Sequence, residues 1–511
     1  MRIIAICLAM ALAAWGQPAA MKGTAAARAA FEKGEAALRN DDWDAAVLHY
    51  GEAIDLDPDF FAAHEQYSTA CTAGKNYHNE ALRKQFELRY LRAAKEHPDK
   101  AVYPYILGLF YQHTNPGLTV SYFEEAVKVD PKFAPAWQGL AFTAAGQGKL
   151  AGSRDYGRKA AEVWSDSARY AMLYVISLQS GEFAAFREAA LEYAKKFPDQ
   201  APSMLGLVAR TGPTSQDARS VYELMHRSYL PAAAGAVEPL FHMYLHEDPA
   251  KAFDLAQETD KPQLAAYAQA VREANAMIAS GRSSAALASL SAVQLPPRTN
   301  RRVLELTLAR ARDVGGDTAL AYTQLLAYLA REPSDETRTA LLALAKKLGK
   351  DAARVEDEVF ALRSKTARAG IPFSAATYTT GQNISLASRK GKVFLLNFWY
   401  PMCGPCRGEF QFLQSVLEKY QDRGFEILAV NAHPTEDAWV KPLMQGWRLD
   451  FLPVRGSEEL LKAYDVTAFP SNFLYGGDGR IYYVPGPVSN ADARRELELQ
   501  VEALLTHRHF E

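Results

Sequence analysis

Two cysteines that stand three residues apart are the clearest chemical feature of this sequence. Cys403-Gly404-Pro405-Cys406 follows closely on an apolar run that ends at Trp399 and precedes a helical pattern. At the start of a helix, the unpaired backbone N–H groups and the helix dipole favour a thiolate, which is the reactive form of cysteine. We therefore expect Cys403 to ionise readily and to act as a nucleophile.

The second cysteine lies one helical turn further along. A spacing of three in the first turn of a helix can place the two Cα atoms within the roughly 4.4 to 6.8 Å that a disulfide requires. Cys406 can then resolve a mixed disulfide formed by Cys403. The neighbouring Arg407 adds positive charge. This pattern predicts a redox-active disulfide and no other cofactor.

Other uses of the cysteine pair stay open. A zinc site needs four ligands, and the sequence has no second cysteine pair, with only His507 and His509 as distant candidates, so we predict no metal. A purely structural disulfide is a further alternative, although such pairs seldom occupy a strand-to-helix corner.

The elements that must position the cysteines begin near Gly370. Val393–Trp399 and Phe425–Asn431 are apolar, β-branched and aromatic runs typical of buried strands. Helical patterns cover 408–420 and 436–447, a glycine-rich turn at 476–479 predicts a hairpin leading into 481–484, and 491–505 predicts a closing helix. This order favours a compact α/β domain over residues 370–511.

The stretch from Asn397 to Glu409 resembles the active-site region of thioredoxin-fold proteins, specifically the exported TlpA-like and ResA-like branch. Pro372-Phe373, the turn around Gly381, Leu386 and Gly391-Lys392 are similar to the extra N-terminal hairpin of that branch. Val466 to Pro470, followed by an apolar strand, resembles its cis-proline loop. The resemblance covers residues 370–511.

The resemblance implies a role for each matching residue. Cys403 corresponds to the attacking cysteine, Cys406 to the resolving cysteine, Glu409 to the carboxylate of a CxxCxxE arrangement, and Pro470 to the cis-proline. Asn397 stands where thioredoxin has a buried aspartate, so another group must take the proton of Cys406. Glu409 is the candidate, and the alternative is that it is a solvated helix residue.

The same resemblance places the substrate-binding residues around the cysteines, at Trp399, Met402, Phe469 and Pro470. A cis bond at Pro470 would expose the backbone of Phe469 to pair with a client peptide strand. Met402 replaces the tryptophan usual beside the first cysteine, and Phe469 is bulky for its position. Both departures concern substrate specificity, not the redox chemistry.

Residues 25–363 are rich in helix-forming patterns separated by short Gly, Pro, Asp or Asn signals. Small residues, a tyrosine and a proline recur at the spacing of tetratricopeptide repeats, which this region resembles: Gly34, Ala37, Ala46, Tyr50, Ala53 and Pro58. The match is best over 25–165, and 166–363 is interpreted as a degenerate helical repeat region. Such a solenoid either docks a protein partner or serves as a spacer.

The whole chain has 511 residues, which indicates more than one domain. A net charge of −2 without a basic block argues against nucleic-acid binding. An apolar run near the N-terminus predicts a signal peptide over residues 1–20 and export, with the periplasm as the expected compartment, and an uncleaved membrane anchor is the alternative. Cleavage would remove Cys7, and Cys71 is expected to be buried in a repeat.

Together these features predict an all-α tetratricopeptide-like solenoid followed by an α/β thioredoxin-like domain. The function expected is an exported thiol-disulfide oxidoreductase with protein thiol or disulfide clients, an upstream electron donor and a partner on the helical repeats. Gly-Pro between the cysteines resembles the reducing end of the family, near roughly −270 mV, better than the oxidising end near about −120 mV. The alternatives are an interaction scaffold with a redox-sensing or weakly active domain, and a thiol peroxidase, although Cys403 lacks the peroxidatic Pro-x-x-x-Thr-x-x-Cys context.

Overall fold

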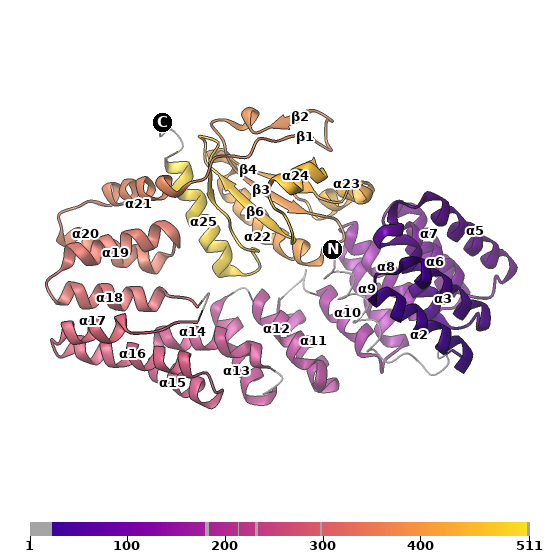
Figure 1. Cartoon of the computed structure of the whole chain (residues 1–511), viewed down its shortest axis with the longest axis horizontal. Helices are drawn as coiled ribbons and strands as arrows, with labels where there is room; N and C mark the ends of the chain where they lie inside the picture. Colours follow the sequence, from indigo (N-terminus) through magenta and orange to yellow (C-terminus); the bar gives the residue numbers. More distant parts are fainter. Residues whose placement is uncertain (1–22, 179–182, 213, 230–232, 297–298, 508–511) are drawn as a thin grey trace. The chain divides into compact units, whose positions relative to one another are not determined.

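The computed structural model describes residues 23–178, 183–212, 214–229, 233–296 and 299–507 (Figure 1). The chain divides into two compact units, one formed by residues up to Tyr193 with Thr435–Arg448, the other by Ala194–Pro434 and Leu449–Glu511. The predicted signal peptide and Cys7 lie outside the described residues. None of the helices in the described ranges has the length and apolarity of a membrane-spanning segment.

The first unit is helical throughout its described residues. Several of its helices begin at side chains that accept a hydrogen bond from the first turn, such as Thr24, Asp42, Asn79 and Asn115. Its α-helices are α2 (Ala25–Arg39), α3 (Trp43–Leu56), α4 (Phe61–Thr72), α5 (Glu80–Glu96), α6 (Val102–Tyr111), α7 (Pro116–Val129), α8 (Ala134–Gly146), α9 (Leu150–Val163), α10 (Ala168–Ser177) and α23 (Asp437–Gly446), and α11 (Phe183–Lys196) spans the division between the units.

Glycines let large aromatic rings pack between these helices. A Cβ atom on Gly34 would lie 2.6 Å from the ring of Tyr50, which is fully buried. Phe123 of α7 is enclosed in the same way, because Cβ atoms on Gly108 and Gly139 would lie 2.5 and 2.6 Å from its ring. The helices at these places can therefore approach closely only because the residue is glycine.

Residues 435–448 pack with the N-terminal helices, a feature that the sequence does not predict. The indole N–H of Trp439 donates to the carbonyl of Gln112 at 2.5 Å, and that of Trp447 donates to the carbonyl of Ala145 at 2.9 Å. Both carbonyls lie at or near the ends of helices, where backbone acceptors lack partners within the helix.

The second unit begins with a further series of helices. They are α12 (Ala201–Thr211), α13 (Ser215–Tyr229), α14 (Val237–Glu247), α15 (Pro249–Glu258), α16 (Pro262–Ala279), α17 (Ser283–Ser291), α18 (Arg302–Val314), α19 (Thr318–Arg331), α20 (Asp335–Lys347) and α21 (Ala352–Thr366). Proline at the first position starts α15 and α16, where its missing N–H has no partner to lose.

A five-stranded mixed sheet follows these helices, in the order β5-β4-β3-β6-β7. β3 pairs in parallel with β4 and antiparallel with β6. The strands are β3 (Val393–Trp399), β4 (Phe425–Asn431), β5 (Leu452–Arg455), β6 (Ser471–Tyr475) and β7 (Ile481–Tyr483), and a separate hairpin is formed by β1 (Ser374–Ala376) and β2 (Asn383–Ser385). This is the thioredoxin-like α/β fold expected from the sequence, with the extra N-terminal hairpin.

Both faces of β3 are covered. Phe394, Leu396 and Phe398 lie in one hydrophobic cluster with residues of the β1 and β2 hairpin and of α24 (Glu458–Ala463). The alternate residues point to the other face, toward α22 (Gly404–Tyr420) and α25 (Ala491–Thr506). Because side chains alternate along a strand, β3 contributes to this hydrophobic cluster on one face and faces the helix that carries the cysteines on the other.

Within this unit, α20 and α21 are joined to the sheet domain by specific contacts. Phe360 stacks on Tyr482 and on His507, with ring centroids 5.5 and 4.3 Å apart. Arg495 forms a two-point ion pair with Asp335, donating from Nε to Oδ2 at 2.7 Å and from Nη2 to Oδ1 at 2.8 Å. The helical segment and the α/β domain are therefore packed together in the second unit.

We expect Phe123→Ala to lower the free energy of unfolding of the first unit by about 3 to 5 kcal/mol, because the cavity left between Gly108 and Gly139 cannot close without moving two helices. Urea unfolding of the full chain, followed by circular dichroism, measures the change. Phe142→Ala, on a side chain that is 38% exposed, is the control and should cost under about 1 kcal/mol. Equal losses in both variants would contradict this packing.

Candidate active site

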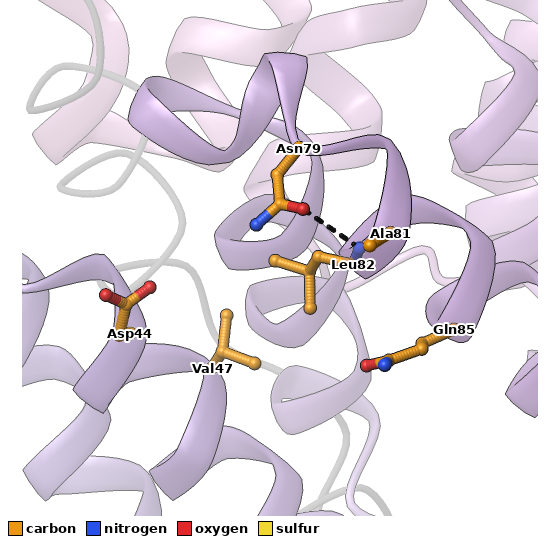
Figure 2. Close-up of a pocket in the computed structure, with 6 residues that line it drawn as sticks. All are labelled: Asp44, Val47, Asn79, Ala81, Leu82 and Gln85. Carbon is orange, nitrogen blue, oxygen red and sulfur yellow. Dashed lines mark hydrogen bonds between the residues drawn. The ribbon is translucent and has the colours of Figure 1, made fainter.

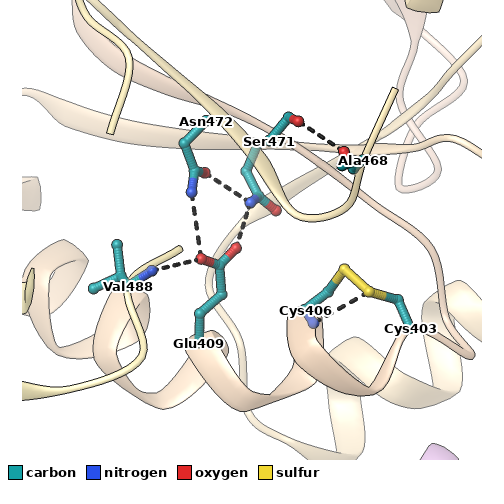
Figure 3. Close-up of a disulfide and its surroundings, with 8 residues drawn as sticks. Cys403, Cys406, Glu409, Ala468, Ser471, Asn472 and Val488 are labelled. Carbon is teal, nitrogen blue, oxygen red and sulfur yellow. Dashed lines mark hydrogen bonds between the residues drawn. A yellow bond between two sulfur atoms is a disulfide. The ribbon is translucent and has the colours of Figure 1, made fainter. Parts of the chain in front are cut away.

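The cysteine pair forms the first turn of α22. Cys403 is the N-cap residue of this helix, and its sulfur accepts a hydrogen bond from the backbone N–H of Cys406 at 3.2 Å. The two residues are joined by a disulfide, and their Cα atoms lie 5.3 Å apart, within the expected range (Figure 3). Once the disulfide opens, the same N–H group and the helix dipole can stabilise a thiolate on Cys403.

The sulfur atoms are well shielded in the oxidised state. Cys403 is 2% exposed and Cys406 is fully buried, whereas Gly404 and Pro405 between them are exposed. The backbone N–H of Cys403 donates to the carbonyl of Tyr400 at 3.0 Å. The pair therefore lies just beneath an exposed Gly-Pro surface.

Glu409 lies one turn after Cys406 and is fully buried, so it is not a solvated helix residue. Its carboxylate accepts hydrogen bonds from Asn397 Nδ2 at 2.7 Å, Asn472 Nδ2 at 3.3 Å and the backbone N–H of Val488 at 3.0 Å (Figure 3). Asn397 Nδ2 also donates to Asn472 Oδ1 at 2.9 Å. The three side chains thus form a closed ring of hydrogen bonds.

Burial dominates the titration of this carboxyl. Removal from water raises the pKa of Glu409 to about 7, and the hydrogen bonds from Val488, Asn397 and Asn472 act in the opposite direction. A carboxyl with this pKa exchanges protons near neutral pH. Glu409 is therefore suited to proton transfer with a thiol.

The loop before β6 contains a cis peptide bond between Phe469 and Pro470, as the resemblance implies. The ring of Phe469 meets those of Tyr400 and His433 edge to face, with centroids 5.3 and 5.8 Å apart. Tyr400 and His433 stack in parallel at 4.1 Å. The bulk of Phe469 is thus part of an aromatic cluster drawn from three segments.

The remaining substrate-binding candidates differ in exposure. Met402 is partly exposed, and Pro470 is buried. Trp399 is fully buried and packs edge to face on Phe410, with centroids 5.1 Å apart, which leaves no surface of Trp399 for a client to contact directly.

The sequence reasoning missed three parts of this site. Asn472 and Val488 hold Glu409, and His433 completes the aromatic cluster. A signal for Asn472 was present, because an amide next to the apolar run Phe473–Tyr475 of a buried strand needs a partner. Val488 acts through its backbone, which no side-chain pattern reveals.

The other cysteine and histidine candidates among the described residues are packed or hydrogen-bonded within the protein. Burial raises the pKa of the Cys71 thiol to about 12, and Cys71 is buried in α4 as expected. His507 stacks on Phe360 and bonds to Asp357, and the described residues contain no group of three or more side chains suited to a metal. His509 lies outside the described residues.

A shallow cavity of about 290 Å³ lies in the first unit, and none of its described lining residues is a cysteine or histidine. It is lined by Asp44, Val47, Asn79, Ala81, Leu82 and Gln85 (Figure 2). Asp44 pairs with Lys75, and Asn79 caps α5. Asp44 and Asn79 therefore serve local structure.

Comparison with known proteins agrees with this geometry. The AhpC/TSA family model matches residues 368–484. The thiol-disulfide oxidoreductase ResA of Geobacillus kaustophilus is 30% identical over 129 residues, which cover 25% of this chain and 74% of that protein. Through its C-terminal domain, the chain belongs to the ResA family.

Other ResA-family proteins match over shorter spans. ResA of Bacillus thuringiensis is 34% identical over 111 residues, and ResA of Bacillus subtilis is 35% identical over 107 residues. These matches cover 22% and 21% of this chain, and the chain spans 64% and 59% of the length of these relatives.

Solved structures that resemble the chain match about a quarter of its length. A thiol:disulfide interchange protein from Chlorobium tepidum TLS is 27% identical, with a TM-score of 0.24, and the match covers 27% of this chain and 97% of that one. The thioredoxin domain of a thiol-disulfide oxidoreductase from Bacteroides vulgatus is 24% identical, with a TM-score of 0.24, covering 26% and 97%.

The raised pKa of Glu409 predicts a loss of stability with rising pH. Its ordinary value is 4.5 and its folded value is about 7, so the unfolded chain ionises first and stability falls between these two pH values and then levels off. We expect this carboxyl to account for about 3 kcal/mol of that loss. Urea unfolding of the oxidised chain at pH 4 and pH 8 measures it.

Glu409→Gln removes the titrating group and is the comparison. As the pH rises from about 4.5 to about 7, the unfolding free energy of the wild type should fall relative to that of the variant. A difference that stays constant with pH would contradict the burial of an ionisable Glu409.

Proposed function

We propose that this chain is an exported thiol-disulfide oxidoreductase that reduces disulfides in client proteins. The observation that carries the proposal is the disulfide between Cys403 and Cys406 at the N-terminus of α22, with the buried Glu409 one turn further on. Membership of the ResA family supports the same chemistry.

In the first step, the reduced Cys403 attacks one sulfur of a client disulfide as a thiolate. A bond forms between Cys403 Sγ and that sulfur, and the client disulfide breaks, releasing its other sulfur as a thiolate. The N-cap position favours this step, because the N–H of Cys406 points at the sulfur of Cys403. The product is a mixed disulfide with the client.

In the second step, Cys406 resolves the mixed disulfide. Its thiol gives its proton to Glu409, and the resulting thiolate attacks Cys403 Sγ, so that the client leaves as a second thiolate. Two electrons have then passed from the cysteine pair to the client. A dithiol donor protein must reduce the pair again before another cycle.

A partner role for the helical repeats belongs to the same proposal. The described helices between Ala25 and Thr366 include one cysteine, the buried Cys71, so they add no second redox centre there. Helical solenoids offer extended surfaces for binding proteins. We assign to this region the docking of a client or of the electron donor, outside the cytoplasm.

A thiol peroxidase is the second candidate, because the family model that matches residues 368–484 is that of AhpC/TSA. In that reaction Cys403 would be oxidised by peroxide to a sulfenic acid, with water formed from the leaving oxygen, and Cys406 would condense with it to the disulfide. The absence of a peroxidatic sequence context around Cys403 favours the reductase.

We expect Cys403→Ser to lower the rate of insulin disulfide reduction by at least about 100-fold, because the cysteine that attacks the client at the N-terminus of α22 is lost. Cys406→Ala should instead trap the mixed disulfide, which non-reducing gel electrophoresis shows and mass spectrometry identifies. Cys71→Ala, the matched control on a buried cysteine, should keep the wild-type rate. Full activity of Cys403→Ser would contradict the assignment, and peroxide consumption without insulin reduction in the wild type would favour the peroxidase.

The direction of the reaction predicts a low midpoint potential for the cysteine pair. With Gly-Pro between the cysteines, we expect a value closer to roughly −270 mV than to about −120 mV. Equilibration of the full chain with glutathione or dithiothreitol redox buffers, followed by thiol alkylation, measures it. A potential above about −150 mV would exclude a reductase of this type.

A further inference from the structure

The hydrogen bonds around Glu409 come from neutral groups only. Asn397 donates from β3, Asn472 donates from β6, and the backbone N–H of Val488 donates from the segment that follows β7. Along its own helix, the nearest titratable groups are the partly exposed Arg407 and Cys406, with Cys403 further away at the N-cap. The charge of the carboxylate is therefore stabilised by amide dipoles and by no cationic side chain among these partners.

The two amides are a cross-strand pair. Asn397 and Asn472 lie directly opposite each other in the antiparallel register of β3 and β6, and both are buried. Both hydrogens of Asn397 Nδ2 are used, one on Glu409 and one on Asn472 Oδ1. Asn472 Nδ2 bonds to Glu409 and, at 3.5 Å, to the carbonyl of Gly486. Asn472 thus orients Asn397 as well as Glu409.

This set of hydrogen-bond partners suits one protonation state of Glu409 better than the other. Every partner of the carboxylate is an N–H donor, which suits the ionised form, whereas a protonated carboxyl needs an acceptor for its own O–H. Asn397 Oδ1 is buried without a hydrogen-bond partner among the described residues. An amide of the ring must therefore turn before a proton on Glu409 can be bonded.

We propose that Asn472 is a positioning residue that, with Asn397, orients the Glu409 carboxylate, favours its ionised form and so sets the pH at which Cys406 gives up its proton. The inference rests on the proposed role of Glu409 in resolving the mixed disulfide. It adds a residue from the strand after the cis-proline to the proton-transfer apparatus. The raised pKa of Glu409 agrees with an arrangement in which these donors offset part of the cost of burial.

The test is the pH dependence of the midpoint potential of the full chain. Asn472→Asp keeps the size of the side chain and the acceptor for Asn397 but turns a carboxylate oxygen toward Glu409, so two carboxyls must share one proton. In a plot of midpoint potential against pH, the pH at which the slope changes should rise by about one pH unit or more. Asn472→Thr removes the amide and substitutes a residue that strands accommodate well. It should raise the pH at which the slope changes by a smaller amount.

The controls separate this role from a general effect of a buried aspartate. Asn431→Asp introduces the same change at a buried asparagine of β4, whose amide bonds to Tyr378 and to the carbonyl of His433 instead of Glu409. Its profile should match the wild type. In the Glu409→Gln background, neither Asn472 variant should shift the profile further.

Each outcome decides between the two claims. If Glu409→Gln changes the pH profile and both Asn472 variants leave it unchanged, the positioning role is overturned and the proposed function stands. If Glu409→Gln itself leaves the profile and the rate of resolution unchanged, the role of Glu409 fails. A shift in Asn431→Asp as large as that in Asn472→Asp would also overturn the inference.

Discussion

Strand β3 is buried along all seven of its residues, and this burial constrains the rest of the site. A buried polar group must find its hydrogen-bond partners inside the protein, and Asn397 is the one amide side chain on the strand. Its partners are Glu409 from α22 and Asn472 from β6. The hydrogen bonds of Asn397 therefore link β3 both to α22, the helix that carries the cysteines, and to β6, the strand that follows Pro470.

The same region shows why a buried carboxylate with neutral partners behaves differently from one with cationic partners. Burial works against the ionisation of Glu498 in α25 as well, yet hydrogen bonds from Lys419 and Arg495 lower its pKa. Glu409 receives three N–H bonds and no cation, and there burial outweighs them. The deeper burial of Glu409 and its lack of a cationic partner together separate it from Glu498, whose ion pairs keep it ionised.

Much of this architecture was predictable from local patterns. The apolar runs of β3 and β4, the glycine turn before β7 and the helical periods marked the main elements of the α/β domain, and the spacing of the cysteines indicated their chemistry. The short elements β5 and α24 had no pattern of sufficient length to predict them. The contacts of Glu409 could not be predicted, because they join residues 12 and 63 positions away in the chain and a backbone N–H 79 positions away.

The aromatic residues around the cysteines show how a departure from a family pattern can be accommodated. Phe469 is large for the position before Pro470, but Tyr400 and His433 provide rings against which it packs edge to face. Such contacts favour the observed orientation of the ring beyond the area that it buries. Because the backbone carbonyl of Tyr400 accepts a hydrogen bond from the N–H of Cys403, the cluster is linked to the first turn of α22. A large residue before Pro470 is therefore compatible with the geometry of the cysteine pair.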